Sequence, residues 1–217
     1  VLAEFRERYP GVDIEILERG SRSLIAALVE GGLDLALIVT SVSSEKARVV
    51  LEREPILSER LVVVSSADAP DPFAVAPGSG PASSTPHESE GTGLSSRISP
   101  TLPISLADLA RVPQIVFPEN YDLRVAMDAA FAAVGISPTI AVQGAEMDAA
   151  LRFAERGVGV AVVPAMVAIN CPALRATPFT SAALNRTVSI ARRSDMAPTH
   201  AAAAMQVLIR EIADRLA

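Results

Sequence analysis

Apolar and polar positions along the chain change period several times, which predicts alternating helices and strands. Leu2, Phe5 and Tyr9 recur at helical spacing, and Pro10 follows them, so a first helix is expected to end there. Residues 12–16 then alternate between apolar and polar side chains, which is the period of a half-buried strand. The chain therefore is expected to begin with a helix and a strand.

The next helix and strand follow in the same order. Ser21 is expected to cap the N-terminus of a helix whose apolar stripe lies between residues 24 and 29. Gly31-Gly32 is expected to end this helix. The continuous apolar run at 35–39 is typical of a strand covered on both faces, as in parallel sheets. The order helix, strand, helix, strand indicates an α/β protein built from βαβ units.

The pattern is interrupted once and then resumes. A buried strand at 61–64 is followed by residues 67–103, which are rich in Pro, Ser, Gly and Thr and poor in large apolar residues. Such a segment buries too little to offset its ordering entropy, so it is predicted to be a flexible surface insertion. Further helices are expected from a capping box at 105–108, at 125–134, at 147–154 and from about residue 198, and strands at 114–117, 139–142, 158–163, 174–179 and 187–191.

Composition narrows the class of protein. The 217 residues are 50% hydrophobic, enough for one large domain or two small lobes. The formal net charge of −6 is unlike the basic face of a domain that grips DNA by itself. The start of the sequence has no apolar run of signal-peptide type, which favours the cytoplasm. Cys171 is the only cysteine, so no internal disulfide is expected.

The sequence lacks the motifs of common enzymes. It has neither a nucleophile elbow nor a phosphate-binding loop. Residues 157–162 begin like a dinucleotide fingerprint but have the pattern of a strand. His87 and His200 have no partner at metal-ligand spacing, and Asp122 and Asp128 are expected on a solvated helix face. No catalytic residue, metal ligand or cofactor is therefore predicted.

The remaining polar residues gather where strands lead into helices, and helix N-termini favour anions and polar groups. Thr40 ends a predicted strand in the same way. The alternative is that Ser21, Asn120 and Glu146 only cap or charge helix starts, and that Arg22 is a surface residue rather than a carboxylate clamp. The three junctions are Gly20-Ser21-Arg22, Pro118-Glu119-Asn120-Tyr121 and Gly144-Ala145-Glu146.

Five short segments, in order, carry a family resemblance. They are Ala3–Val12 (AEFRERYPGV), Leu28–Leu37 (LVEGGLDLAL), Leu57–Val64 (LSERLVVV), Ile104–Leu109 (ISLADL) and Ala154–Pro164 (AERGVGVAVVP). Together they resemble the effector-binding domain, also called the substrate-binding domain, of LysR-type transcriptional regulators. The match is strongest over residues 2–39, and the five segments together cover most of the chain apart from the insertion.

The resemblance implies an α/β fold of two Rossmann-like lobes of periplasmic-binding-protein type (type 2), joined by two crossover strands. Lobe I is expected to comprise residues 1–60 and 167–217, and lobe II residues 61–166. The winged helix-turn-helix and the first strand of lobe I found in the family are absent from this sequence. The insertion at 67–103 is longer than the family pattern.

In members of this family, a small-molecule effector binds between the two lobes. Carried over by position, the residues expected to bind it are Ser21, Thr40, Pro118, Glu119, Asn120, Glu146 and Pro164, with Arg22 as a possible clamp. The resemblance also implies a homodimer or homotetramer, in which Leu2 and Phe5 of one subunit meet the helix at 122–134 of another. DNA would be bound only through the missing N-terminal domain, and no membrane is involved.

Two alternatives remain open. A transport-linked solute-binding protein has the same fold and would be distinguished by a signal peptide or a lipid-anchored cysteine upstream. An enzyme on this fold would need a nucleophile, a base or a metal set, and the sequence offers none of these at a recognisable spacing.

Overall fold

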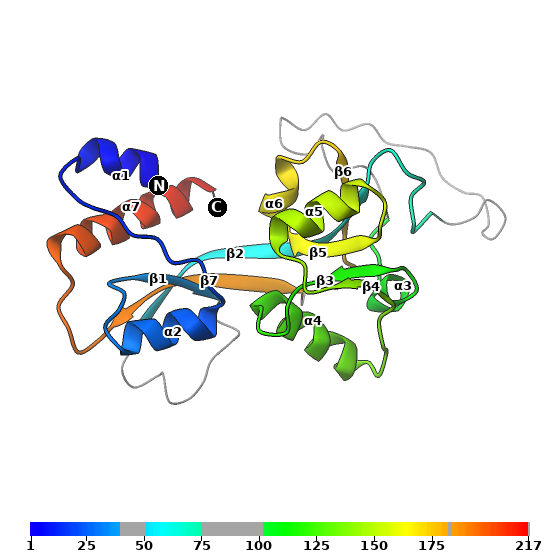
Figure 1. The fold of residues 1–217 in the computed structure, drawn as a ribbon, viewed down its shortest axis with the longest axis horizontal. Coiled ribbons are helices and arrows are strands. Elements are labelled where there is room, and N and C mark those ends of the chain that lie inside the picture. Colours follow the sequence, from blue (N-terminus) through cyan, green and yellow to red (C-terminus); the bar gives the residue numbers. More distant parts are fainter. Residues whose placement is uncertain (40–50, 75–101, 182–183, 217) are drawn as a thin grey trace. The chain divides into compact units, whose positions relative to one another are not determined.

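The computed structural model describes residues 1–39, 51–74, 102–181 and 184–216 (Figure 1). The chain forms two compact units. The first comprises Val1–Glu59, Asn120–Asp122 and Asn185–Ala217, and the second comprises Arg60–Glu119 and Leu123–Leu184. The return to the first unit therefore falls at residue 185, later than the expected 167.

The later boundary has a physical reason. The helix α6 (Ala165–Ile169) and the strand β6 (Leu174–Pro178) follow residue 164 directly. The strand β6 pairs antiparallel with the second half of β2 (Leu51–Ser66), from Val62↔Pro178 to Ser66↔Leu174. These backbone hydrogen bonds hold residues 167–184 in the second unit, so only β7 (Asn185–Arg193) and α7 (His200–Leu216) return to the first.

The first unit packs helices against a small antiparallel sheet. Its strand β1 (Ala36–Val39) pairs antiparallel with β7, in the register Ala36↔Ala191, and β7 lies next to β2 in the sheet order. Leu24, Ile25 and Leu28 of the helix α2 (Ser21–Val29) pack against Ile38 and Ala191. In Figure 1 the helix α1 (Leu2–Arg8) lies beside α7. The apolar stripe predicted for residues 24–29 thus faces this core.

Three sequence predictions in the first unit are wrong. Residues 12–16 form no strand, because none of the residues that the structure describes pairs with them, and Ile16 is 65% exposed. The strand β1 is covered on one face only, since Leu37 is 49% exposed and the pairing is antiparallel. The N-cap of α2 is Gly20 rather than Ser21, which is the first helical residue.

Charged pairs join the outer helices of the first unit. Arg8 of α1 contacts Glu4 at 2.5 Å and Glu211 of α7 at 3.1 Å. Arg210 of α7 donates to Glu54 of β2 at 2.5 Å. This hydrogen bond from Arg210, ahead of the one from Gln206, holds the pKa of the Glu54 carboxyl below its ordinary value. The pairs are partly exposed, so water and salt screen them and each contributes little to stability.

The second unit contains the parallel strands that the sequence predicted. The strand order is β6-β2-β5-β3-β4, and β3 pairs parallel with both β4 and β5, whereas β2 pairs antiparallel with β5 and β6. The other elements of this unit are α3 (Leu106–Ala110), β3 (Gln114–Val116), α4 (Asp122–Ala133), β4 (Ile140–Gln143), α5 (Met147–Glu155) and β5 (Val160–Pro164).

Helices cover both faces of this sheet. Every residue of β5 is buried, which requires packing on both sides, and Figure 1 shows α4 on one side of the strands with α5 and α6 on the other. The predicted capping box of α3 is confirmed: Ser105 accepts from the N–H of Asp108, whose carboxylate accepts from the N–H of Ser105. Gly135 and Gly157 follow α4 and α5 with φ of +68° and +72°, the left-handed conformation that ends these helices.

Candidate functional site

Ser21 is a buried polar residue at the N-terminus of α2, only 3% exposed. Its hydroxyl oxygen accepts a hydrogen bond from the N–H of Val39, at the end of β1, at 2.9 Å. Its own N–H donates to Oδ2 of Asp122 at 3.0 Å, and its hydroxyl donates to the same oxygen. Ser21 therefore joins the end of β1, the start of α2 and the start of α4.

Asn120 and Asp122 lie close to the start of α2, although they follow Ser21 by about a hundred positions in the sequence. Both belong to the first unit, whereas the residues on either side of Asn120–Asp122 belong to the second. The approach is close: a Cβ at Gly20 would lie 3.0 Å from the carbonyl oxygen of Asn120. The structure thus brings two of the predicted residues, Ser21 and Asn120, into the same neighbourhood.

Asp122 was missed by the sequence analysis, and its predicted position on a solvated helix face is wrong. Its carboxylate is half-buried and receives two hydrogen bonds from Ser21. Asp128 is also not without a partner, because Arg124 donates to both of its oxygens, at 2.9 and 2.8 Å. No local pattern marks a contact over 101 positions, so only the tertiary fold reveals the first of these pairs.

For Arg22 and Thr40, the described part of the chain shows no contact that supports their predicted roles. Arg22 follows Ser21 in α2, is exposed, and forms no ion pair with any of the described residues. Thr40 lies outside the described residues, so its predicted role stays a prediction.

The other predicted residues gather at one edge of the sheet in the second unit. Pro118 and Glu119 follow β3, Glu146 follows β4, and Pro164 ends β5. Because β3 is parallel to both neighbours, the carboxyl ends of the three strands lie at the same edge, where ligands of open α/β sheets bind. The carbonyl oxygen of Val116 accepts from the N–H groups of Gly144 at 3.0 Å and Ala145 at 3.3 Å.

These hydrogen bonds hold the loops after β3 and β4 together. Glu146 is the N-cap of α5, but its side chain makes no capping hydrogen bond and is exposed. Glu119 is exposed, Pro118 is half-buried, and Pro164 is buried. The edge therefore offers an exposed carboxylate at each of two neighbouring loops and one buried proline ring.

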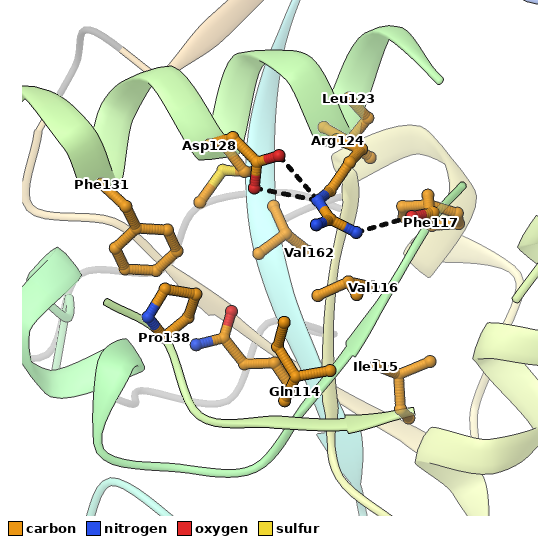
Figure 2. Close-up of a pocket in the computed structure, with 12 residues that line it drawn as sticks. Gln114, Ile115, Val116, Phe117, Leu123, Arg124, Asp128, Phe131, Pro138 and Val162 are labelled. Atoms are coloured by element: carbon orange, nitrogen blue, oxygen red, sulfur yellow. Dashed lines mark hydrogen bonds and ion pairs between the residues drawn. The ribbon is translucent and has the colours of Figure 1, made fainter. Parts of the chain in front are cut away.

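A small pocket lies elsewhere in the second unit, between α4 and the strands β3 to β5 (Figure 2). Figure 2 shows Arg124 between Asp128 and the carbonyl oxygen of Phe117, to which it donates at 3.1 Å. The cavity measures about 20 Å³, which is room for about one water molecule. None of the predicted site residues lines it, and it is too small for an organic ligand.

The chemistry of the candidate residues is that of hydrogen bonding. Among the residues that the structure describes, no group of three or more His, Cys, Asp and Glu side chains is placed to hold a metal ion. Over the same ranges, none of the helices is long and apolar enough to cross a membrane.

Comparison with known proteins gives the family. The sequence model of the LysR substrate-binding domain matches residues 1–77 and 95–216. The chain belongs to the LysR substrate-binding domain family. The unmatched residues 78–94 fall inside the segment at 67–103 that the sequence analysis took for an insertion, and they lie outside the described residues.

Solved structures confirm the fold of this LysR substrate-binding domain. The effector-binding domain of QuiR in complex with shikimate is 17% identical, with a TM-score of 0.70 over 99% of this chain and 88% of that one. The effector-binding domain of BenM with its effector benzoate is 21% identical, with a TM-score of 0.70 over 99% and 84%. The two-lobed, periplasmic-binding-protein-like α/β fold expected from the sequence is confirmed.

A curated relative shows how much of a longer protein the domain matches. The transcriptional regulator CysB of Burkholderia cenocepacia, of the helix-turn-helix type, is 25% identical over 169 residues, which are 78% of this chain and 44% of that protein. The chain spans a little less than half the length of the curated relatives that it matches.

Proposed function

We propose that this LysR substrate-binding domain is the effector-sensing part of a transcriptional regulator, in which it binds a small molecule and catalyses nothing. The family match over most of the chain supports the proposal, and so does the buried, hydrogen-bonding Ser21 at the start of α2. Two relatives of similar fold bind small organic acids: the effector-binding domain of QuiR binds shikimate, and that of BenM binds its effector benzoate. A small polar molecule is accordingly the ligand class proposed for this chain.

The proposed ligand contacts are the residues predicted from the sequence. Ser21 and Asn120 lie together at the start of α2 in the first unit, and Pro118, Glu119, Glu146 and Pro164 lie at the sheet edge in the second. Arg22 and Thr40 remain proposed neighbours. The cleft between lobes that the family resemblance implies stays a prediction, since each unit is described by itself.

In the complete protein, ligand binding would shift the population of conformations and thereby the DNA-binding activity of a separate N-terminal domain. The protein is proposed to act in the cytoplasm as a homodimer or homotetramer. DNA is contacted through the N-terminal domain alone.

A ligand screen tests the binding function. The melting temperature of the 217-residue chain is measured against a panel of organic acids, amino acids, amides and aromatic compounds, because a ligand that binds only the folded state raises it. We expect at least one compound to raise the melting temperature of the wild type and not that of Ser21→Ala. The exposed Ser23→Ala in the same helix turn is the matched control and should keep the response.

The regulatory function is tested in the full-length protein. Deleting residues 1–217 should leave operator binding and remove the response of a reporter gene to the compound found in the screen. A full-length gene that encodes no upstream helix-turn-helix would contradict the proposal.

A further inference from the structure

The start of α2 already holds an anion that belongs to the chain itself. Ser21 gives both its N–H and its hydroxyl proton to Oδ2 of Asp122. The N–H groups of Ser23 and Leu24 go to the carbonyl oxygen of Gly20, at 2.9 and 3.2 Å. A helix N-terminus attracts anions because its N–H groups and its dipole point outward. Here the carboxylate of Asp122 takes that place.

Ser21 has no donor left for a second acceptor. A serine hydroxyl carries one proton, which Asp122 receives, and the hydroxyl oxygen accepts the N–H of Val39 at 2.9 Å. Within the described residues, Oδ1 of Asp122 accepts no hydrogen bond. Ser21 itself therefore presents no free donor, and the acceptor beside it is the half-buried carboxylate of Asp122.

The charge of Asp122 is not neutralised by an ion pair with any described residue. The nearest arginine on the same helix, Arg124, is engaged with Asp128 and with the carbonyl oxygen of Phe117. A carboxylate or phosphate group arriving beside Asp122 would thus meet a like charge at close range.

The backbone keeps Asp122 in this place. The carbonyl oxygen of Asn120 lies 3.0 Å from where a Cβ of Gly20 would be, so the segment at 120–122 packs directly on the start of α2. An incoming anion would have to displace the carboxylate of Asp122 from the N–H and hydroxyl of Ser21. Because the chain holds this carboxylate beside its donors, its effective concentration there is high.

We propose that Asp122 is a specificity-determining residue for the ligand. It excludes carboxylate and phosphate groups from the start of α2 and selects a ligand that offers a donor there, such as a hydroxyl, amide or ammonium group. This inference rests on the proposed function, because it concerns which small molecule the same site accepts.

Inorganic sulfate provides a probe that needs no knowledge of the ligand. The backbone amide signal of Ser21 is followed by NMR during titration with sodium sulfate, with sodium chloride at equal ionic strength as the reference. In the wild type we expect no saturable sulfate-specific shift. In Asp122→Asn the neutral side chain removes the like charge, and we expect sulfate to bind at Ser21 roughly tenfold more tightly or better.

Matched variants complete the design. Asp122→Glu keeps the charge and should stay as insensitive to sulfate as the wild type. Asp108→Asn makes the same exchange at the start of α3, where Asp108 also accepts from a serine N–H and hydroxyl. It should leave the response of Ser21 unchanged. Asp122→Ala is a second neutral variant and should respond as Asp122→Asn does.

Two results would overturn the inference. A sulfate-specific shift of Ser21 in the wild type as large as in Asp122→Asn would show that the carboxylate does not exclude anions. Neutral variants that remain insensitive would show that another group excludes them. If the neutral variants fail to fold, a saturable sulfate-specific shift of Ser21 in the wild type alone overturns the inference. Because sulfate replaces the ligand, either result leaves the thermal-shift test of the proposed function standing on its own.

Discussion

The helices α2 and α3 start with the same pair of side chains, a serine and an aspartate, but the partners lie at different separations along the chain. At α3, Ser105 donates its hydroxyl to Asp108 at 2.6 Å and its N–H at 3.0 Å, over 3 positions. At α2, Ser21 donates the same two groups to Asp122, over 101 positions. The same hydrogen-bond chemistry is therefore reached once locally and once through the fold.

The difference shows what each pair does. The aspartate of α3 is fixed by its own helix turn, so the pair stabilises that helix wherever it lies. The aspartate of α2 is in place only when the segment at 120–122 packs on Gly20. The first pair is a helix cap, whereas the second also reports that distant parts of the chain have come together.

The largest expected effect is at Ser21. Ser21→Ala removes the hydroxyl donor to Asp122, keeps the backbone N–H donor, and leaves the part-buried N–H of Val39 without its acceptor. We expect a loss of about 2–3 kcal/mol in the free energy of unfolding, measured by urea denaturation, with faster hydrogen exchange of the Val39 amide. Ser23→Ala is the control, and an equal loss in both variants would contradict this assignment.

A smaller effect is expected at the local cap. Ser105→Ala removes the acceptor for the N–H of Asp108 and the hydroxyl donor to the Asp108 carboxylate, whereas the backbone N–H of residue 105 can still donate to that carboxylate. The expected loss is about 1 kcal/mol in the free energy of unfolding, since water can reach part of this helix start. If Ser105→Ala cost as much as Ser21→Ala in the same denaturation experiment, the contrast between the two pairs would disappear.

Acid should weaken the local pair in a defined direction. The hydrogen bonds from the hydroxyl and the N–H of Ser105 hold the pKa of the Asp108 carboxyl below its ordinary value of 3.8. A carboxyl whose pKa is lower in the folded chain than in the unfolded chain stabilises the fold at pH values above its unfolded-state pKa. This contribution to stability is lost as the pH falls through the folded-state pKa.

The difference in unfolding free energy between wild type and Ser105→Ala should therefore be constant well above pH 3.8 and shrink below it. Urea titrations at a series of pH values measure this difference. A gap that widens on acidification would contradict the assigned pKa direction.

The smallest effect is expected at Arg22. This side chain is exposed beside Ser21, so Arg22→Ala should change the free energy of unfolding by no more than about 0.5 kcal/mol. A loss close to that of Ser21→Ala would mean that the charge of Arg22, rather than the buried hydroxyl, stabilises the start of α2. Denaturation of the two variants side by side separates these outcomes.

The candidate site was predictable to the extent that its residues follow strands. Three parallel strands were recognised from their apolar runs, and the candidate residues lie at their carboxyl ends: Pro118 and Glu119 follow β3, Glu146 follows β4, and Pro164 ends β5. Asp122 could not be found in this way, because nothing in its neighbourhood along the chain announces Ser21 as its partner. The sequence shows that Asp122 lies close after Asn120, but it does not show that Asp122 accepts hydrogen bonds from Ser21.

By itself, the sequence determined the elements whose stability is local or whose pattern is long. The capping box at Ser105, the glycines after α4 and α5, and the buried run of β5 are all encoded within a few residues, because capping and period depend on near neighbours. The tertiary structure alone decided that residues 12–16 stay unpaired, that residues 167–184 join the second unit, and that Asp122 meets Ser21. Strand pairing and long-range hydrogen bonds depend on which distant segment packs against a residue. The residues next to it in the sequence do not indicate which segment that is.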